Sequence, residues 1–141
     1  MNNHHNAVLA LDVGERRIGV ALADLQTRLP SPLTTLERSD SIFHDIHRLI
    51  DEYGVTVLVV GLPRGLDGQH TRQTVAVEEF KSDLERTLSI PVYWQDEALT
   101  SQLAEDELKA RGRPYKKEDI DALSAAYILE DFLRDHPEVV L

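Results

Sequence analysis

AVLALDV (residues 7–13) and RIGVALA (residues 17–23) are two apolar runs of strand length, separated by a three-residue turn. The first run is apolar on both faces, as in a strand that is buried on both sides, and the turn joins the two into a predicted β-hairpin. Asp12 interrupts the first run, among apolar neighbours. A buried carboxylate there is costly unless it is paired or binds a metal. The alternative is a strand-end acid bonded to backbone N–H groups from Gly14 onward.

Outside this hairpin, the chain alternates between apolar runs and helical stripes. Two prolines mark residues 31–36 as an edge strand. The remaining segments predict helices at 40–53, 71–88, 100–110 and 117–134, and strands at 55–60 and 90–95. The order β-β-β-α-β-α-β-α-α predicts an α/β fold with a mixed five-stranded sheet flanked by helices on both faces. The ribonuclease H-like architecture has this order. We expect a single domain over residues 1–141, with an ordered core at about 7–134.

Composition limits the function classes. The chain has 141 residues, of which 42% are hydrophobic and 28% charged, values typical of a globular protein. Because it contains no cysteine, a disulfide scaffold, a cysteine zinc site and a cysteine nucleophile are all excluded. No apolar run has the length of a membrane span, and residues 1–6 do not resemble a secretory signal. We therefore expect a cytoplasmic protein with no membrane partner.

The formal net charge of −10 argues against indiscriminate binding to nucleic acid. The charge is unevenly distributed, because residues 111–117 contain basic residues and no acid. This segment could contact a phosphate backbone, with Tyr115 available to stack on a base. The alternative is an ordinary solvated loop between two helices.

Two further acids stand where a site is expected. Glu97 follows the strand at 90–95, at the sheet edge where open α/β folds bind ligands, but alternation does not choose between Glu97 and Asp96. Asp121 begins an apolar stripe on the last predicted helix, whereas Asp119 lies on a more polar face. Each acid could instead be an ordinary acid at a helix start.

Three carboxylates from Asp12, the 96–97 pair and the last helix would repel one another at one sheet edge. Divalent cations relieve that repulsion. One or two Mg²⁺ or Mn²⁺ ions held there would clamp a phosphodiester and activate a water molecule. The pattern therefore favours metal-dependent phosphodiester hydrolysis.

Four ordered motifs carry a family resemblance, which extends from about Ala7 to Leu133. They are LALDVGERRIGVALAD (9–24), VVGLPRGLDGQ (59–69), DEALTSQLAEDEL (96–108) and KKEDIDALSAAYILEDFL (116–133). Together they resemble the YqgF/RuvX family of Holliday-junction-resolvase-like or pre-16S rRNA nucleases. The resemblance implies a ribonuclease H-like fold and a metal-dependent endonuclease. It also implies that the catalytic and metal-binding acids are Asp12, Glu97 and Asp121.

For function, the resemblance implies maturation of the 16S rRNA 5′ end or, as an alternative, cleavage of branched DNA. The family usually has an arginine after the glutamate, where this chain has Ala98; Arg64 is a candidate replacement for that phosphate contact. The candidate nucleic-acid contacts are Arg16, Arg17, Arg64, Arg72, Arg111, Arg113, Lys116 and Lys117.

Two other function classes fit the sequence less well. A non-catalytic nucleic-acid-binding or transcription-associated module is disfavoured by the intact acidic trio. A phosphotransferase is disfavoured because the chain is too short for a two-lobed nucleotide cleft. No dimer face is recognisable in the sequence, so both a monomer and a homodimer stay open.

Overall fold

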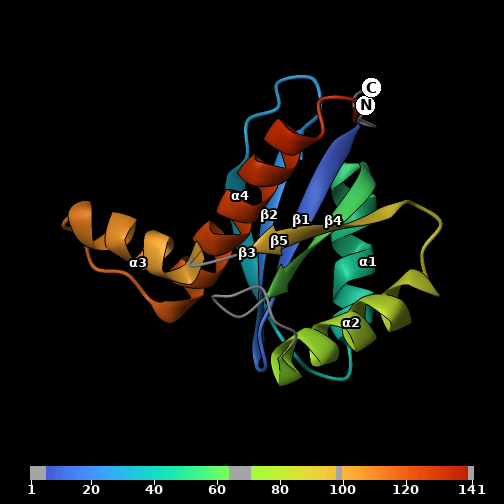
Figure 1. Ribbon diagram of the computed structural model, residues 1–141, viewed down its shortest axis with the longest axis horizontal. Helices are drawn as coiled ribbons and strands as arrows, with labels where there is room; N and C mark the ends of the chain where they lie inside the picture. Colours follow the sequence, from blue (N-terminus) through green and yellow to red (C-terminus); the bar gives the residue numbers. More distant parts are fainter. Residues whose placement is uncertain (1–5, 64–70, 98–99, 140–141) are drawn as a thin grey trace.

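The computed structural model describes residues 6–63, 71–97 and 100–139. Its elements are β1 (Ala7–Val13), β2 (Arg17–Asp24), β3 (Ser31–Glu37), α1 (Ile42–Tyr53), β4 (Val55–Pro63), α2 (Arg72–Glu85), β5 (Val92–Glu97), α3 (Thr100–Ala110) and α4 (Lys117–Asp135) (Figure 1). Their order is the predicted β-β-β-α-β-α-β-α-α. Within the described part of the chain, no helix has the length and apolarity needed to cross a membrane.

The strands form one mixed sheet in the order β3-β2-β1-β4-β5. The pairs β1–β2 and β2–β3 are antiparallel, whereas β1–β4 and β4–β5 are parallel. β3 is an edge strand, as its prolines predict. Because β1, β4 and β5 run in the same direction, their carboxyl ends meet at one edge of the sheet. Asp12 and Glu97 both lie at that edge.

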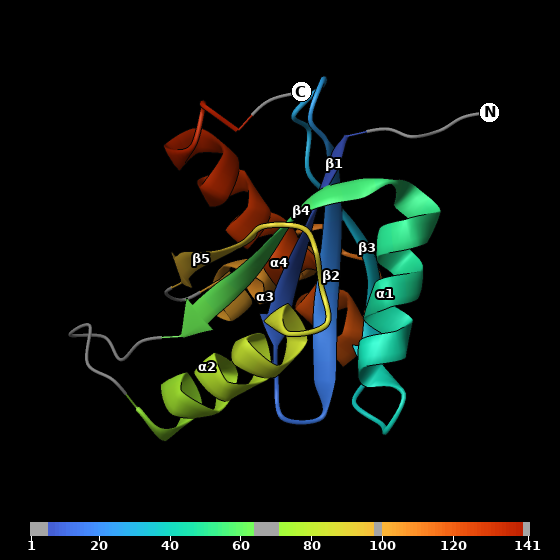
Figure 2. The ribbon, with the colours of Figure 1, turned by 90° about the vertical axis from the view of Figure 1, so that its right-hand side faces the viewer.

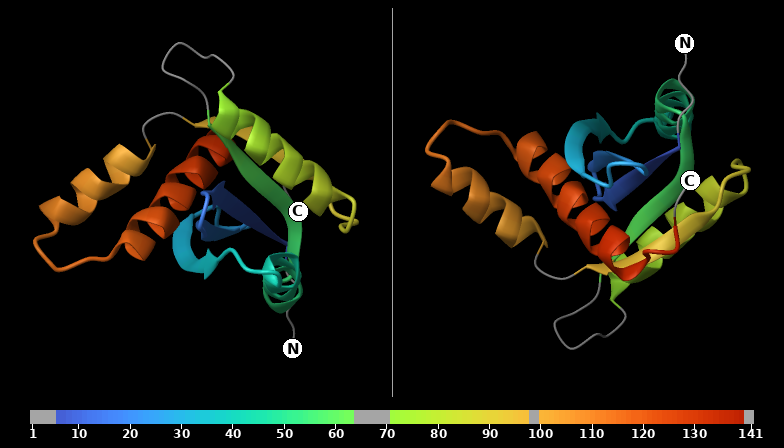
Figure 3. Two further views of the ribbon diagram at one scale, coloured as in Figure 1. Left: turned by 90° about the horizontal axis from the view of Figure 1, so that it is seen from below. Right: turned by 90° about the horizontal axis from the view of Figure 1, so that it is seen from above.

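Alternation along β1 divides its side chains between the two faces of the sheet. α1 and α2 cover one face of the sheet, and α4 covers the other (Figures 2 and 3). Leu9 and Leu11 pack in the apolar cluster with α1 and α2, whereas Val8 and Ala10 pack in the cluster with α4. Asp12 continues the series of Val8 and Ala10. Its side chain therefore belongs to the face that α4 covers.

α4 crosses β2 at very close range at Gly19. A Cβ atom at this position would lie 1.9 Å from the carbonyl oxygen of Asp121, so only glycine fits there. Gly19 is also the sheet partner of Asp12. The close crossing therefore brings the first turns of α4, with Asp121, beside the carboxyl end of β1.

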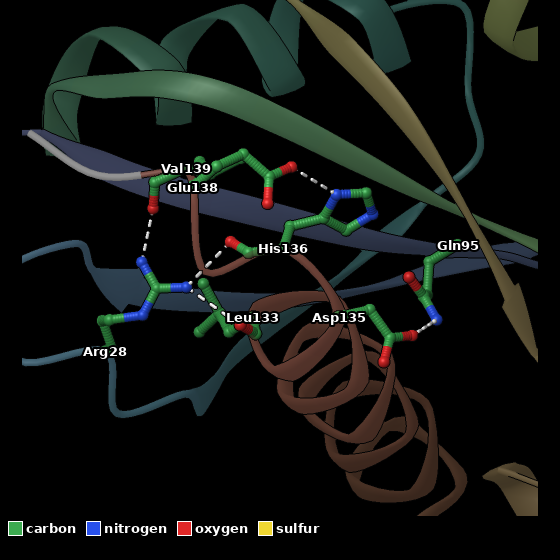
Figure 4. A network of polar contacts seen from close by, with 7 residues as sticks. All are labelled: Arg28, Gln95, Leu133, Asp135, His136, Glu138 and Val139. Carbon is green, nitrogen blue, oxygen red and sulfur yellow. Dashed lines mark hydrogen bonds and ion pairs between the residues drawn. The ribbon is translucent and has the colours of Figure 1, made fainter.

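The far end of α4 is held by Arg28, from the turn between β2 and β3 (Figure 4). Its guanidinium group donates hydrogen bonds to the carbonyl oxygens of Leu133 (2.9 Å), His136 (3.1 Å) and Val139. The last carbonyls of a helix have no partner within the helix, and Arg28 supplies one. α4 is therefore fixed at both of its ends.

α3 packs along α4 and extends away from the sheet (Figures 1 and 3). Its buried residues Ala104 and Leu108 join the same apolar cluster as α4, and Glu107 accepts a hydrogen bond from Tyr127 of α4. A cleft of about 540 Å³ lies between β3, the end of α3 and the start of α4. Arg113 and Tyr115 are among its lining residues.

Candidate active site

Asp12 and Glu97 form the centre of the candidate site. Their carboxyl groups are hydrogen-bonded to each other. Gly61 of β4 makes room for this contact, because a Cβ atom there would lie 2.5 Å from Oε2 of Glu97. The neighbouring Asp96 is exposed at the surface. The structure therefore places Glu97, rather than Asp96, beside Asp12.

This pair of carboxyl groups resists ionisation. Burial, together with the negative charges of Glu97 and Asp121, raises the pKa of Asp12 to about 8. Burial also raises the pKa of Glu97, although hydrogen bonds from Thr100 and Asp12 partly oppose this effect. Near neutral pH the pair consequently retains a proton, and no basic side chain of the described residues is among the groups that shift these two pKa values.

Two buried hydroxyl groups support the pair, and the sequence did not single out either for this role. Thr100 Oγ1 donates a hydrogen bond of 3.2 Å to Oε1 of Glu97. Ser124 Oγ lies 3.1 Å from Thr100 Oγ1. The hydroxyl group of Ser124 also hydrogen-bonds the carboxyl group of Asp12. The one available signal was a serine within the buried stripe of α4.

Asp121 lies next to this pair but is bound by a different partner. Its Oδ2 atom is 2.6 Å from Nε of Arg17, the first residue of β2, and this contact raises the pKa of Arg17. The stripe that Asp121 begins is buried at Ala125 and Ile128, as the helical spacing predicts. Asp119 instead accepts a hydrogen bond of 2.8 Å from the backbone N–H of Lys116.

The donor set suits a hard divalent cation, which prefers carboxylate oxygens. Asp12 is a partly buried acid whose charged form has no cationic partner among the described residues, and a dication would supply one. Within residues 6–63, 71–97 and 100–139, no three acidic or histidine side chains lie close enough to hold an ion. The structure brings two of the predicted ligands together, and Arg17 engages the third.

The predicted nucleic-acid contacts are dispersed around this site. Arg16 is exposed in the β1–β2 turn and, with Arg17 and Asp121, lines an open cleft of about 270 Å³. Lys117 precedes Asp121 by about one turn of α4, roughly 6 Å along its axis. The basic residues that border the acids are therefore those of the hairpin turn and of the start of α4.

The remaining basic candidates lie elsewhere or are already paired. Arg111 forms an ion pair with Glu107 on α3. Arg113 and Lys116 are exposed between α3 and α4, and Arg72 is exposed at the start of α2. Arg64 lies outside the described residues, as does Ala98.

The architecture is that of the ribonuclease H-like class. The structure of RuvC from Thermus thermophilus matches with a TM-score of 0.57 and 14% identity, over 93% of this chain and 96% of that one. The T. thermophilus RuvC in complex with a Holliday junction substrate matches with a TM-score of 0.55 and 14% identity, over 92% and 95%. These likenesses establish the fold.

Sequence comparison then gives the family. The family profile described as "RuvX: Holliday junction resolvase" matches residues 6–135. A protein of Chloroflexus aggregans named "Putative pre-16S rRNA nuclease" is 43% identical over 134 residues, which cover 92% of this chain and 94% of the relative. A relative of the same name from Roseiflexus sp. is 42% identical over 139 residues, or 94% and 97% of the two chains. This chain belongs to the RuvX family.

Proposed function

We propose that this protein is a metal-dependent endonuclease that matures the 5′ end of pre-16S rRNA, with residues 1–141 acting as a single nuclease domain. The observation that carries the proposal is the partly buried, hydrogen-bonded pair of Asp12 and Glu97, with Asp121 beside it, at the carboxyl edge of the sheet. The names of the relatives support the choice of rRNA as substrate. Such a role places the protein in the cytoplasm.

In this proposal, Asp12, Glu97 and Asp121 hold one or two Mg²⁺ or Mn²⁺ ions. When bound, these ions activate a water molecule and stabilise the oxygen that leaves the phosphorus. Thr100 and Ser124 fix the orientation of the two buried carboxylates by hydrogen bonds. Ligands held in this way lose less freedom when an ion binds.

The basic residues position the nucleic-acid backbone. Arg16, Arg17 and Lys117 lie nearest to the acids, and Lys116 and Arg113 continue the basic surface toward the cleft beside β3. Their charges offset the net charge of −10 locally.

The test is cleavage of two end-labelled substrates, a 16S rRNA 5′ precursor and a four-way DNA junction. Each is incubated with Mn²⁺, Mg²⁺ or a chelator, and wild type is compared with Asp12→Asn. We expect metal-dependent cleavage of the RNA that falls at least about 10³-fold in Asp12→Asn, because a transition-state interaction of about 4 kcal/mol is removed. Asp96→Asn is the matched control, since it removes an exposed acid next to Glu97.

The pattern of cleavage distinguishes the proposed function from its alternatives. Cleavage of the junction in preference to the RNA would establish the branched-DNA alternative, which the family description and the RuvC-like fold favour. Binding without cleavage of either substrate would establish a non-catalytic module. Equal cleavage by wild type and Asp12→Asn would refute the assignment of the acids.

A further inference from the structure

The ion pair between Arg17 and Asp121 links the start of β2 to α4 beside the candidate site. Arg17 begins β2 and Asp121 lies in the second turn of α4, so two separate elements contribute the partners. The contact between Nε and Oδ2 measures 2.6 Å, and both side chains are about one quarter exposed. This arrangement has a direct consequence for the third carboxylate of the site.

The guanidinium group of Arg17 occupies one lone-pair direction of Asp121 Oδ2 and neutralises its charge, so it competes with a cation for this carboxylate. The positive charge of Arg17 also repels a dication at short range. Among the described residues, neither Asp12 nor Glu97 has a guanidinium partner. Their two carboxyl groups are hydrogen-bonded to each other, and Ser124 and Thr100 supply the further hydrogen bonds. Arg17 therefore distinguishes Asp121 from the other two acids.

We propose that Arg17 is an internal counter-ion which a divalent cation displaces from Asp121, and that the displaced guanidinium group then binds a phosphate of the nucleic acid. This inference rests on the proposed function and adds a positioning residue to it. The pair is partly exposed, and such pairs contribute only a factor of up to about five to an equilibrium. Displacement by a dication is therefore inexpensive.

The displaced side chain remains near the site. Glu37 and Glu118 are the other acids that act on the charge of Arg17, so favourable electrostatics persist there after Asp121 is lost. The cleft of about 270 Å³ beside Arg17 is open to solvent and is lined by Gly14, Glu15 and Arg16 as well. A guanidinium group suits a phosphate because it donates two parallel hydrogen bonds.

The first experiment measures the affinity for Mn²⁺ by titration calorimetry at pH 8, without nucleic acid. We expect Arg17→Gln to bind Mn²⁺ about 3- to 10-fold more tightly than wild type, because the competitor is removed. Arg16→Gln is the matched control, because it makes the same change of charge one residue away in the same cleft, and its affinity should change less than about twofold. Arg17→Lys should lie between wild type and Arg17→Gln.

The second experiment measures RNA binding by fluorescence anisotropy, with Ca²⁺ as the cation. Gel electrophoresis verifies that the RNA stays intact. With cation, Arg17→Gln should bind about 10-fold more weakly than wild type. In chelator the two should bind equally, because Arg17 is then occupied by Asp121. Thermal unfolding of each variant verifies that it is folded.

The outcomes separate the two proposals. An Arg17→Gln variant that binds Mn²⁺ no more tightly than wild type, or that weakens RNA binding equally with and without cation, overturns the role of Arg17. Tighter Mn²⁺ binding by Arg17→Gln in a protein that cleaves neither substrate supports the role of Arg17 and refutes the nuclease proposal. Absence of Mn²⁺ binding by wild type and by all variants overturns both.

Discussion

In the proposed metal site, protonation of Asp12 should make the affinity for Mn²⁺ depend on pH. Its pKa is raised to about 8 by burial and by the neighbouring acids, so a cation that binds below pH 8 must displace a proton. We expect the apparent affinity for Mn²⁺ to rise about tenfold per pH unit from pH 6 to about pH 8 and then to level off. Calorimetry in buffers of different ionisation enthalpy counts the released proton. An affinity independent of pH would contradict this account.

The same residue destabilises the metal-free protein in alkali. Between its ordinary pKa of 3.8 and its folded value of about 8, Asp12 binds more proton in the folded than in the unfolded state. Its contribution to stability is therefore fully present below about pH 4 and is lost as the pH rises through 8. In chelator at pH 8.5, we expect Asp12→Asn to unfold several degrees above wild type. The reverse order at pH 8.5 would show that Asp12 is not buried as described.

Ser124 and Thr100 should affect metal binding without contacting substrate. Ser124→Ala removes a buried hydroxyl that hydrogen-bonds Asp12 and lies beside Thr100. We expect Mn²⁺ affinity to fall about 10-fold, a typical effect of losing a group that orients a ligand. Ser101→Ala, whose exposed hydroxyl lies 3.4 Å from Ser124, is the control. Equal affinities for Ser124→Ala and wild type would remove Ser124 from the site.

At the residue scale, the candidate acids could be predicted from the sequence, whereas the hydroxyl groups of Thr100 and Ser124 that hydrogen-bond them could not. Asp12 stood out because apolar neighbours surround it, and Asp121 because an apolar stripe follows it at helical spacing. Glu97 could not be separated from Asp96 by alternation, because that choice depends on the space above Gly61 in a different strand. The Arg17–Asp121 pair joins residues 104 positions apart, and no local pattern encodes such a contact.

Among the elements, α4 depends on one glycine. Gly19→Ala would place a methyl group 1.9 Å from the carbonyl oxygen of Asp121, so the helix must move away from β2. We expect a loss of stability of about 3 kcal/mol, at the upper end for overpacking, together with loss of Mn²⁺ binding. Thermal unfolding and calorimetry measure the two effects.

Val20→Ala is the matched control for Gly19→Ala. Val20 is fully buried in the same strand on the opposite face, so its truncation costs about 2 kcal/mol by leaving a cavity. It should leave Mn²⁺ affinity unchanged in the folded protein. Equal losses of affinity in the two variants would mean that stability alone, rather than the helix crossing, controls the site.

The order and type of the elements could be predicted from periodicity, because each apolar run or stripe packs into one of the two apolar clusters on the faces of the sheet. The crossing of α4 over β2 could not be predicted from the sequence. It depends on the side chain that Gly19 lacks and on contacts between segments distant in sequence. The extension of α3 away from the sheet was also beyond local pattern, since its buried residues resemble those of any amphipathic helix.

For the molecule as a whole, the Arg28 contacts should be worth more than a surface ion pair. Arg28→Gln loses hydrogen bonds to three carbonyl groups at the end of α4, and we expect a loss of about 2 kcal/mol. Arg134→Gln breaks only exposed ion pairs and should cost less than about 0.5 kcal/mol. Denaturant unfolding compares the two, and similar midpoints would argue against the role of Arg28.

Arg28 binds the carbonyl oxygen of Leu133 at one end of α4, and Asp121 lies near the other end of the same helix. Residues 121 and 133 are about 18 Å apart along its axis. A helix of this length transmits a shift along its axis, because its backbone hydrogen bonds resist compression. The turn that carries Arg28 contains none of the proposed ligands. A chemical crosslink or a light-responsive group placed in that turn would therefore adjust the proposed metal site remotely, while every residue of that site stays native.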